Sequence, residues 1–147
     1  MKEFAEIAKT WIGVRYSHRG ITRRGCDCTG LLIGIANELG YLLNYKLRMY
    51  ARDWSLHAGA GNYVVEELEK FGNEISNEEV EVGDVLVFSF GKCLAHVGVL
   101  VNKSNMLFVH SFLTAKRCKY AILKNSIWSK RWKKTYRISN DKMVLYK

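Results

Sequence analysis

The spacing of apolar residues changes about halfway along the chain, and this change limits the possible folds. Up to about residue 71, apolar residues recur every three or four positions, which is the spacing of an amphipathic helix. After Asn77, apolar residues come instead in short β-branched or aromatic runs bounded by glycine, aspartate and asparagine. Helices followed by strands predict an α+β fold, with N-terminal helices packed on a central antiparallel β-sheet.

Three helices are predicted in the first half of the chain. The apolar spacing predicts them over about residues 3–12, 28–39 and 61–71. Gly13 ends the first helix and Gly40 is a natural C-terminal cap for the second. The third helix follows a predicted loop that contains Asp53 and Trp54.

The second half predicts consecutive strands. Three runs are clear, and two further strands are expected nearer the C-terminus; the five cover residues 85–88, 97–101, 106–109, 120–123 and 135–138. The last nine residues, 139–147, fit either a tail or a strand. The chain has 147 residues, of which 48% are hydrophobic, and it shows no repeat or linker. We therefore expect one domain over residues 1–147 with its own core.

Cysteine content and the N-terminus indicate the compartment. Four cysteines in this length do not make the framework of a small disulfide-rich scaffold, so reduced thiols are expected. The first nine residues have no apolar h-region, and no stretch approaches the length of a membrane span. We expect cytoplasmic synthesis without a signal peptide. A substrate outside that compartment would then require delivery in a virion or by another secretion apparatus.

The charge balance favours an anionic partner. The chain carries 23 basic and 14 acidic residues, a net charge of +9. Much of the excess lies in residues 116–134, where Trp128 and Trp132 are interleaved with the basic side chains. Three interpretations stay open: nucleic-acid binding, contact with an anionic cell-wall polymer, or an ordinary solvated surface.

The run Gly25–Leu32 contains the candidate nucleophile. It places Cys28 at a turn just before an amphipathic helix, where backbone N–H groups and the helix dipole lower the pKa of a thiol. His96 opens one predicted strand and His110 ends the next, so a hairpin would bring both imidazoles toward one end of the sheet. The expected roles are nucleophile for Cys28, base for His96 and orienting residue for His110.

Four segments resemble the motif blocks of the NlpC-type cysteine peptidases, and they occur in that family's order. The segments are Asp27–Leu31, Val82–Phe88, His96–Val99 and Phe108–Ser111. The resemblance implies a papain-like fold and hydrolysis of peptidoglycan stem peptides, typically next to D-glutamate and diaminopimelate. It gives Cys28, His96 and His110 the same three catalytic roles. It implies no cofactor.

Further resemblances indicate residues that contact the substrate. The segment Trp11–Tyr16 is similar to the family's segment ahead of the nucleophile, which makes Tyr16 a candidate for hydrogen bonding near the thiol. His18 is close enough in sequence to line the same groove. Asp27 and Thr29 flank the nucleophile and complete the expected substrate-binding set.

Asp27 also has two local roles open to it. As the residue before the helix, it can cap the helix or pair with an arginine such as Arg23 or Arg24. Two other positions depart from the family pattern: Thr29 stands where serine is usual, and Val82 stands where proline is usual. The loop between His96 and His110 is also slightly longer than in most members.

The Gly25–Cys28 run, His18 and the segment Tyr50–Trp54 look closest to the peptidases of phage tails and gene transfer agents. That branch would explain a cell-wall enzyme without a signal peptide, and it adds phage tail proteins as expected partners. Three other functions stay open. They are a thiol amidase or acyltransferase of the same fold, a tail-tip structural or binding module with weak or lost peptidase activity, and a nucleic-acid-binding protein.

Cys26 is the second thiol in the same turn. It could be a supporting residue, a redox partner for Cys28 or plain packing, and Cys93 and Cys118 are taken as packing. Cys26 and Cys28 could also join the two histidines in a zinc site. Structural zinc sites usually separate their two cysteines by two to four residues, whereas only Asp27 lies between these two, so no metal is expected.

Overall fold

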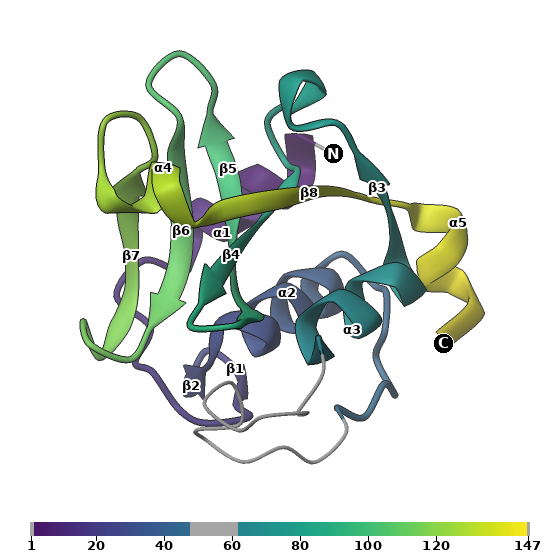
Figure 1. Cartoon of the computed structure of the whole chain (residues 1–147). Coiled ribbons are helices and arrows are strands. Elements are labelled where there is room, and N and C mark those ends of the chain that lie inside the picture. Colours follow the sequence, from purple (N-terminus) through teal and green to yellow (C-terminus); the bar gives the residue numbers. More distant parts are fainter. Residues whose placement is uncertain (1, 48–61, 147) are drawn as a thin grey trace.

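Six strands form one antiparallel sheet in the computed structural model, which describes residues 2–47 and 62–146. Their order across the sheet is β3-β8-β4-β5-β6-β7 (Figure 1). The strand bounds are β3 Gly72–Ile75, β4 Val85–Phe90, β5 Cys93–Asn102, β6 Leu107–Phe112, β7 Arg117–Ile122 and β8 Trp132–Ile138. A separate two-stranded hairpin, β1 Ile21–Thr22 and β2 Gly25–Cys26, precedes the second helix.

Three helices pack on one face of the sheet, and their bounds are α1 Lys2–Thr10, α2 Cys28–Glu38 and α3 Tyr63–Phe71 (Figure 1). They share a hydrophobic core with alternate residues of the central strands, including Val87, Val97 and Val109. The other residues of the same strands point to the opposite face, because side chains alternate along a strand. Phe88 and Phe108 form a second cluster there, with Trp128 of α4 (Ile127–Arg131).

The second helix, α2, is buried on nearly all sides. Residues 29–36 are all buried, as a helix must be when it lies between a sheet and other helices. Two of its glycines permit this close packing. A Cβ on Gly30 would lie 1.7 Å from the carbonyl oxygen of Gly20, and one on Gly34 would lie 2.2 Å from the Trp11 ring. The position of Cys28 therefore depends on a tightly packed helix.

The α+β expectation is confirmed, and the observed strands extend beyond the predicted apolar runs at most ends. Strand β3 was not predicted, because its exposed Asn73 and Glu74 make no apolar run; pairing with β8 holds this strand in place. Three predictions lie outside the described residues: the start of the third helix at residue 61, the loop at Asp53 and Trp54, and the role of the segment Tyr50–Trp54.

Residues 139–147 were expected to be a tail or a strand, and that expectation is wrong for the described part. Asn140–Met143 form the short helix α5 and Val144–Tyr146 form the 3-10 turn η3. The Ser139 side chain caps α5, and Met143 is 1% exposed within the helix-side core. Among the described residues, no helix is long and apolar enough to cross a membrane.

Candidate active site

Cys28 is the first residue of α2, and Asp27 fixes the turn that precedes it. One carboxylate oxygen of Asp27 accepts the N–H of Gly30 at 2.7 Å, and the other accepts the N–H of Arg19 at 2.8 Å. Asp27 is thus the N-cap of the helix, one of its two expected roles. Arg23 pairs with Glu38, at 2.6 Å between Nε and Oε1.

The Cys28 thiol lies against the strand that carries His96. Its Sγ is 3.9 Å from the carbonyl oxygen of Ala95 and 3.9 Å from Oγ1 of the buried Thr29. Ala95 immediately precedes His96 in β5. The structure therefore places the candidate nucleophile beside the backbone of the candidate base.

The pKa of Cys28 shifts in the direction opposite to the sequence expectation. Burial, followed by the negative charge of Asp27, raises the pKa of this thiol to about 12. The backbone N–H of Val97 and the polar groups of Thr29 act in the lowering direction, but they are outweighed. Packing against β5 removes the thiol from water, and this desolvation outweighs the effect of the helix start. The resting group is the neutral thiol.

His96 and His110 are in direct contact. The Nε2 of His96 lies 2.7 Å from the Nδ1 of His110, across the pairing of β5 with β6. Both side chains are buried, with 6% and 1% of their surface exposed. The hairpin predicted from the sequence therefore brings the two imidazoles together.

Both imidazoles are neutral at pH 7. Burial, and then the neighbouring His110, holds the pKa of His96 well below its usual value. Burial, and then the positive charge of Lys119, lowers the pKa of His110 to about 4. A neutral His96 can accept a proton from a neutral thiol, which is general-base chemistry. The preformed thiolate and imidazolium pair expected from the sequence is not the resting state.

The hydrogen bond between thiol and imidazole is absent from the resting arrangement. Within residues 2–47 and 62–146, the hydrogen-bond partners of Cys28 Sγ are Thr29, the carbonyl oxygen of Ala95 and the backbone N–H of Val97, not the His96 ring. Because His96 Nε2 is engaged with His110, only Nδ1 is left to accept the thiol proton. Proton transfer thus requires the sulfur to leave the Ala95 carbonyl and reach that nitrogen.

Comparison with known proteins assigns the family. The sequence model of the NlpC/P60 family matches residues 13–137. The chain belongs to the NlpC/P60 family. All four motif blocks singled out in the sequence lie inside the matched range.

Curated relatives of this NlpC/P60 chain are bacterial. It is 26% identical over 128 residues to the murein DD-endopeptidase MepS/murein LD-carboxypeptidase of Escherichia coli strain K12. That match covers 87% of this chain and 57% of the relative, so the chain spans little more than half of that protein. It is also 26% identical over 136 residues to a probable endopeptidase of Haemophilus influenzae, covering 91% of this chain and 72% of the relative.

Solved structures share the NlpC/P60 fold. An NLP/P60 family protein of Staphylococcus aureus superposes with a TM-score of 0.63 at 21% identity, covering 93% of this chain and 40% of its own. The NlpC/P60 domain of the peptidoglycan hydrolase SagA gives a TM-score of 0.60 at 15% identity, with 92% and 97% covered. These likenesses show that the helices and the antiparallel sheet form a papain-like domain.

Cys26 of this NlpC/P60 chain turns away from Cys28. Its sulfur lies 3.5 Å from that of Cys118, and both side chains are fully buried. Its carbonyl oxygen accepts the Ser111 hydroxyl at 2.6 Å, which ties the strand of His110 to the nucleophile turn. Cys26 therefore packs against Cys118. No group of three or more metal-ligating side chains suited to an ion occurs in the described part of the chain.

Sequence reasoning missed the aromatic side chains that surround the two imidazoles. Rings from β4, β6 and α4 lie within 6 Å of one or both histidine rings; these are Phe88, Phe90, Phe108, Phe112 and Trp128. We call these five residues the aromatic box. Part of it was visible in the sequence, because Phe108, His110 and Phe112 alternate along one strand and so share a face.

The expected substrate-binding residues are brought near the nucleophile turn by the backbone. Tyr16 forms a parallel bridge with Cys26, and its N–H donates to the carbonyl oxygen of Lys116 at 2.9 Å. His18 follows on the same segment, and both residues are half-buried. Their contact with substrate stays a prediction.

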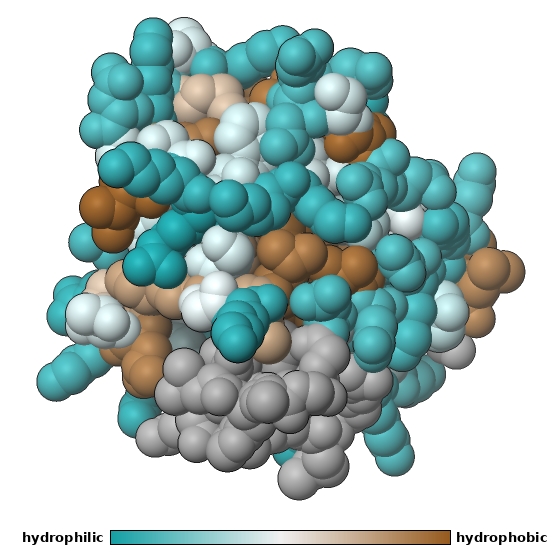
Figure 2. Space-filling view, in the orientation of Figure 1, coloured by the Kyte–Doolittle hydropathy of each residue, from teal (hydrophilic) through white to brown (hydrophobic). Residues whose placement is uncertain are grey.

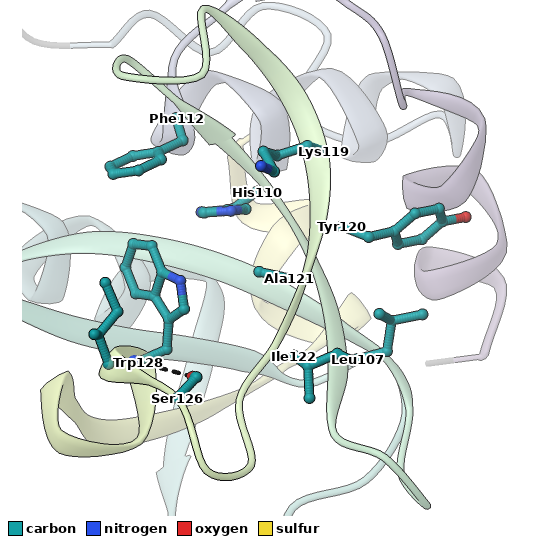
Figure 3. Close-up of a pocket in the computed structure, with 10 residues that line it drawn as sticks. Leu107, His110, Phe112, Lys119, Tyr120, Ala121, Ile122, Ser126 and Trp128 are labelled. Atoms are coloured by element: carbon teal, nitrogen blue, oxygen red, sulfur yellow. Dashed lines mark hydrogen bonds between the residues drawn. The ribbon is translucent and has the colours of Figure 1, made fainter.

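An open pocket of about 660 Å³ lies on the α4 side of the sheet, with His110 in its wall (Figure 3). Figure 3 shows Phe112, Lys119 and Trp128 grouped around His110, while Tyr120 and Ile122 lie farther along β7. Lys119 is the register partner of His110 across the β6–β7 pair. The pocket thus lies on the side of the sheet that carries the imidazoles.

Residues 116–134 form β7, α4 and the start of β8. Hydrophilic residues dominate the molecular surface in the view of Figure 2, with smaller apolar patches between them. The two interleaved tryptophans are used in packing: Trp128 is 7% exposed, and the indole N–H of Trp132 donates to Thr135 at 3.2 Å. They do not form an exposed stacking surface for bases, which removes the main argument for nucleic-acid binding.

Proposed function

We propose that this chain is a cysteine peptidase that hydrolyses amide bonds in peptidoglycan stem peptides. The observation that supports the proposal is the contact of the Cys28 thiol with the carbonyl oxygen of Ala95, the residue before His96, together with the 2.7 Å contact between the rings of His96 and His110. Membership of the NlpC/P60 family and the murein endopeptidase among its relatives support peptidoglycan as the substrate. Cleavage next to D-glutamate and diaminopimelate is the finer part of the proposal.

The reaction begins with proton transfer from Cys28 Sγ to Nδ1 of His96. The sulfur forms a bond to the scissile carbonyl carbon, and the carbonyl electron pair moves to the oxygen. Asp27 occupies the N–H of Gly30 and, through its backbone carbonyl, that of Leu31, so we assign the oxyanion to the N–H of Cys28. His110 holds the orientation of the His96 ring throughout.

Collapse of the tetrahedral intermediate breaks the C–N bond. His96 returns its proton to the leaving amine, and a thioester joins the acyl group to Cys28. A water molecule then gives its proton to His96 and attacks the thioester carbon, which releases the acid and restores the thiol. The cycle uses side chains of this chain, the backbone N–H of Cys28 and water.

Incubation with peptidoglycan fragments that contain diaminopimelate, followed by mass spectrometry of the products, tests the proposal. The wild-type protein should cut an amide bond with gain of one water, and Cys28→Ala should abolish cleavage. Cys93→Ala is the matched control, because it removes a half-buried thiol of β5 and should retain full activity. Cleavage by Cys28→Ala would show that another group is the nucleophile.

The same experiment separates the alternatives. An acyltransferase of this fold would yield a product joined to an added amine, without gain of water. A module with weak or lost peptidase activity would leave the fragments intact in wild type and Cys28→Ala alike.

Delivery by a phage tail or gene transfer agent particle is a further proposal, together with synthesis in the cytoplasm without a signal peptide. It rests on the likeness of the Gly25–Cys28 run and His18 to the tail-associated branch. Immunodetection of the chain in purified particles tests it. Recovery of all the protein away from the particles would contradict tail association.

A further inference from the structure

Acidic and basic residues are segregated along the chain. From Val85 to Asn140 the sequence contains eleven lysines and arginines and no aspartate or glutamate. This stretch forms five strands of the sheet, β4 to β8, together with α4. The part of the fold that it builds therefore has no acidic side chain of its own to neutralise its cations.

Three of the eleven cations pair with carboxylates from a neighbouring segment. Lys103, Lys134 and Arg137 contact acidic residues between positions 74 and 84, at 2.7–3.0 Å. The other eight form no ion pair with a described residue, and five of them lie between positions 117 and 131. Uncompensated positive charge is therefore concentrated on β7, on α4 and on the loop between them.

The two cations of β7 that follow Lys116 point to the side of the sheet that carries the imidazoles. Arg117 is the register partner of Phe112, and Lys119 is the register partner of His110. Register partners project from the same face of a sheet. Lys119 also lines the pocket beside His110 (Figure 3).

The helix α4 and the loop before it add cations around the same pocket. Lys124 lies in the loop that joins β7 to α4, and Lys130 follows Ile127, which lines the pocket, by three positions on the helix surface. Arg131 ends the helix. Its guanidinium lies 4.5 Å from the centre of the Phe90 ring and donates to the carbonyl oxygen of Ser89 at 3.2 Å, which holds this charge in place.

One pair of arginines is opposed directly. Arg15 forms an antiparallel bridge with Arg117, and both side chains are exposed. Like charges directly opposite each other destabilise a strand pair, and a bound anion would offset this repulsion. We call these six residues the basic face: Arg15, Arg117, Lys119, Lys124, Lys130 and Arg131.

The basic face offers charge without a stacking surface for bases. Trp128 is 7% exposed, and Tyr120, which is 40% exposed, alternates with Lys119 along β7. Figure 3 shows the side chains of Lys119 and Tyr120 on opposite sides of this strand. Proteins that bind single-stranded nucleic acid combine cations with exposed rings on which bases stack. A polyanion without bases therefore fits this face better than nucleic acid.

We propose that the basic face binds a base-free phosphodiester polymer of the cell wall, a polyol phosphate chain, and so holds the pocket beside His110 against the wall. Arginine and lysine side chains are the usual protein ligands of phosphate groups. The polymer presents one negative charge at each repeat, which suits several cations set apart on one face. The proposal rests on the proposed function in taking the cell wall as the place where the protein acts.

Titration of fluorescently labelled poly(glycerol phosphate) with the protein, followed by anisotropy, tests the proposal. With five to six phosphate contacts, Kd should rise on the order of 100-fold between about 50 and 200 mM sodium chloride. The triple variant Arg117→Gln/Lys124→Gln/Lys130→Gln should bind about tenfold more weakly at low salt and lower the slope of log Kd against log salt by about two. All three side chains are exposed, and Lys119 is kept because it faces His110.

The matched control removes three positive charges elsewhere. Lys2→Gln/Lys46→Gln/Lys103→Gln changes exposed side chains outside the basic face and lowers the net charge by the same amount. It should bind the polymer like the wild type. Equal weakening in the two triple variants would overturn the proposal, because net charge would then explain the binding. So would wild-type binding that is absent or insensitive to salt.

Single-stranded DNA with the same number of phosphates is the second probe. It should bind no more tightly than poly(glycerol phosphate). Binding of the DNA at least about tenfold more tightly would assign the basic face to nucleic acid and overturn the proposal.

Polymer binding and hydrolysis are independent readouts. The titration needs no cleavage, so it tests the basic face even if the protein cuts no peptidoglycan fragment. If the protein binds the polymer through the basic face but cleaves nothing, the proposed peptidase activity fails and the binding surface stands. If the protein cleaves fragments in a Cys28-dependent way but does not bind the polymer, this inference fails and the proposed function stands.

Discussion

The Cys28 thiol and the His96 imidazole at the candidate site are both neutral and do not form an ion pair. Burial raises the pKa of the Cys28 thiol to about 12 and holds the pKa of His96 well below its usual value. Each shift disfavours charge, because both side chains are removed from water. Charge must then develop as the substrate binds and the sulfur attacks, where the N–H of Cys28 at the start of α2 can stabilise it.

Asp27→Asn should lower the pKa of Cys28, because the negative charge of Asp27 is the second cause of its elevation after burial. Alkylation by iodoacetamide below pH 9 should become faster. It is measured in a Cys93→Ala background, where Cys28 is the one partly exposed cysteine beside the buried Cys26 and Cys118. The amide oxygen can still cap Gly30, so the free energy of unfolding should fall by only about 1 kcal/mol. Slower alkylation would contradict the assigned electrostatic effect.

In helix α2, close packing against other segments outweighs the low helix propensity of two of its residues. Its two interior glycines are poor helix formers, yet each allows backbone or ring atoms from another segment to approach closely. This close packing fixes the first turn, where Asp27 and Cys28 lie. The sequence predicted the helix and its Gly40 end, where φ is +85°, but not the reason for the interior glycines.

The sign of the change in the free energy of unfolding caused by Gly30→Ala distinguishes helix propensity from close packing. Helix propensity alone would predict a gain of about 1 kcal/mol for this change. The added Cβ would lie 1.7 Å from the Gly20 carbonyl oxygen, so we expect a loss of about 2–3 kcal/mol in urea denaturation. Glu3→Ala on the exposed face of α1 is the control and should change stability little. A stabilised Gly30→Ala protein would show that this close packing is absent.

The C-terminal helix α5 packs into the core of the molecule, although its local sequence did not predict this. Met143 of α5 lines the same small cavity as Phe4 of α1 and Phe71 of α3. Segments from both ends of the chain therefore contribute to one core.

Met143→Ala should lower the free energy of unfolding by about 2–4 kcal/mol, as is typical for a buried methionine. Leu145→Ala is the matched control two residues away, because Leu145 is 78% exposed. Its effect should be within about 0.5 kcal/mol. Equal, negligible effects of both changes in urea titrations would restore the interpretation of these residues as a tail.

Global stability should fall as the pH drops from about 6.5 toward 4. The folded pKa of His110 is about 4, below its ordinary value of 6.5, so the unfolded chain binds the proton more readily in that range. Stability from the neutral, buried ring is present above pH 6.5 and is lost during acidification, by up to roughly 3 kcal/mol for His110. Burial of His96 acts in the same direction.

Denaturant titrations at pH 7 and pH 4.5 measure this loss. His110→Phe keeps an aromatic ring in the box and removes the titrating group, so its stability should depend less on pH than that of the wild type. An identical pH dependence in the two proteins would show that His110 is already protonated, or exposed, in the folded state.

The elements and the order of the chemical groups could be predicted from the amino-acid sequence alone. The change of hydrophobic period gave the α+β layout, and local spacing placed Asp27 as a cap and Cys28 at the helix start. These properties depend on neighbours along the chain, which a sequence displays directly. The hairpin that brings His96 to His110 follows from two adjacent strands and was predictable for the same reason.

The chemical behaviour of those groups depends on tertiary packing. The direction of the Cys28 pKa shift, the contact of Cys26 with Cys118, the aromatic box and the burial of Met143 all join segments far apart in sequence. Each depends on which side chains exclude water from a given atom. That exclusion is a property of the packed molecule, and no local spacing of residues encodes it.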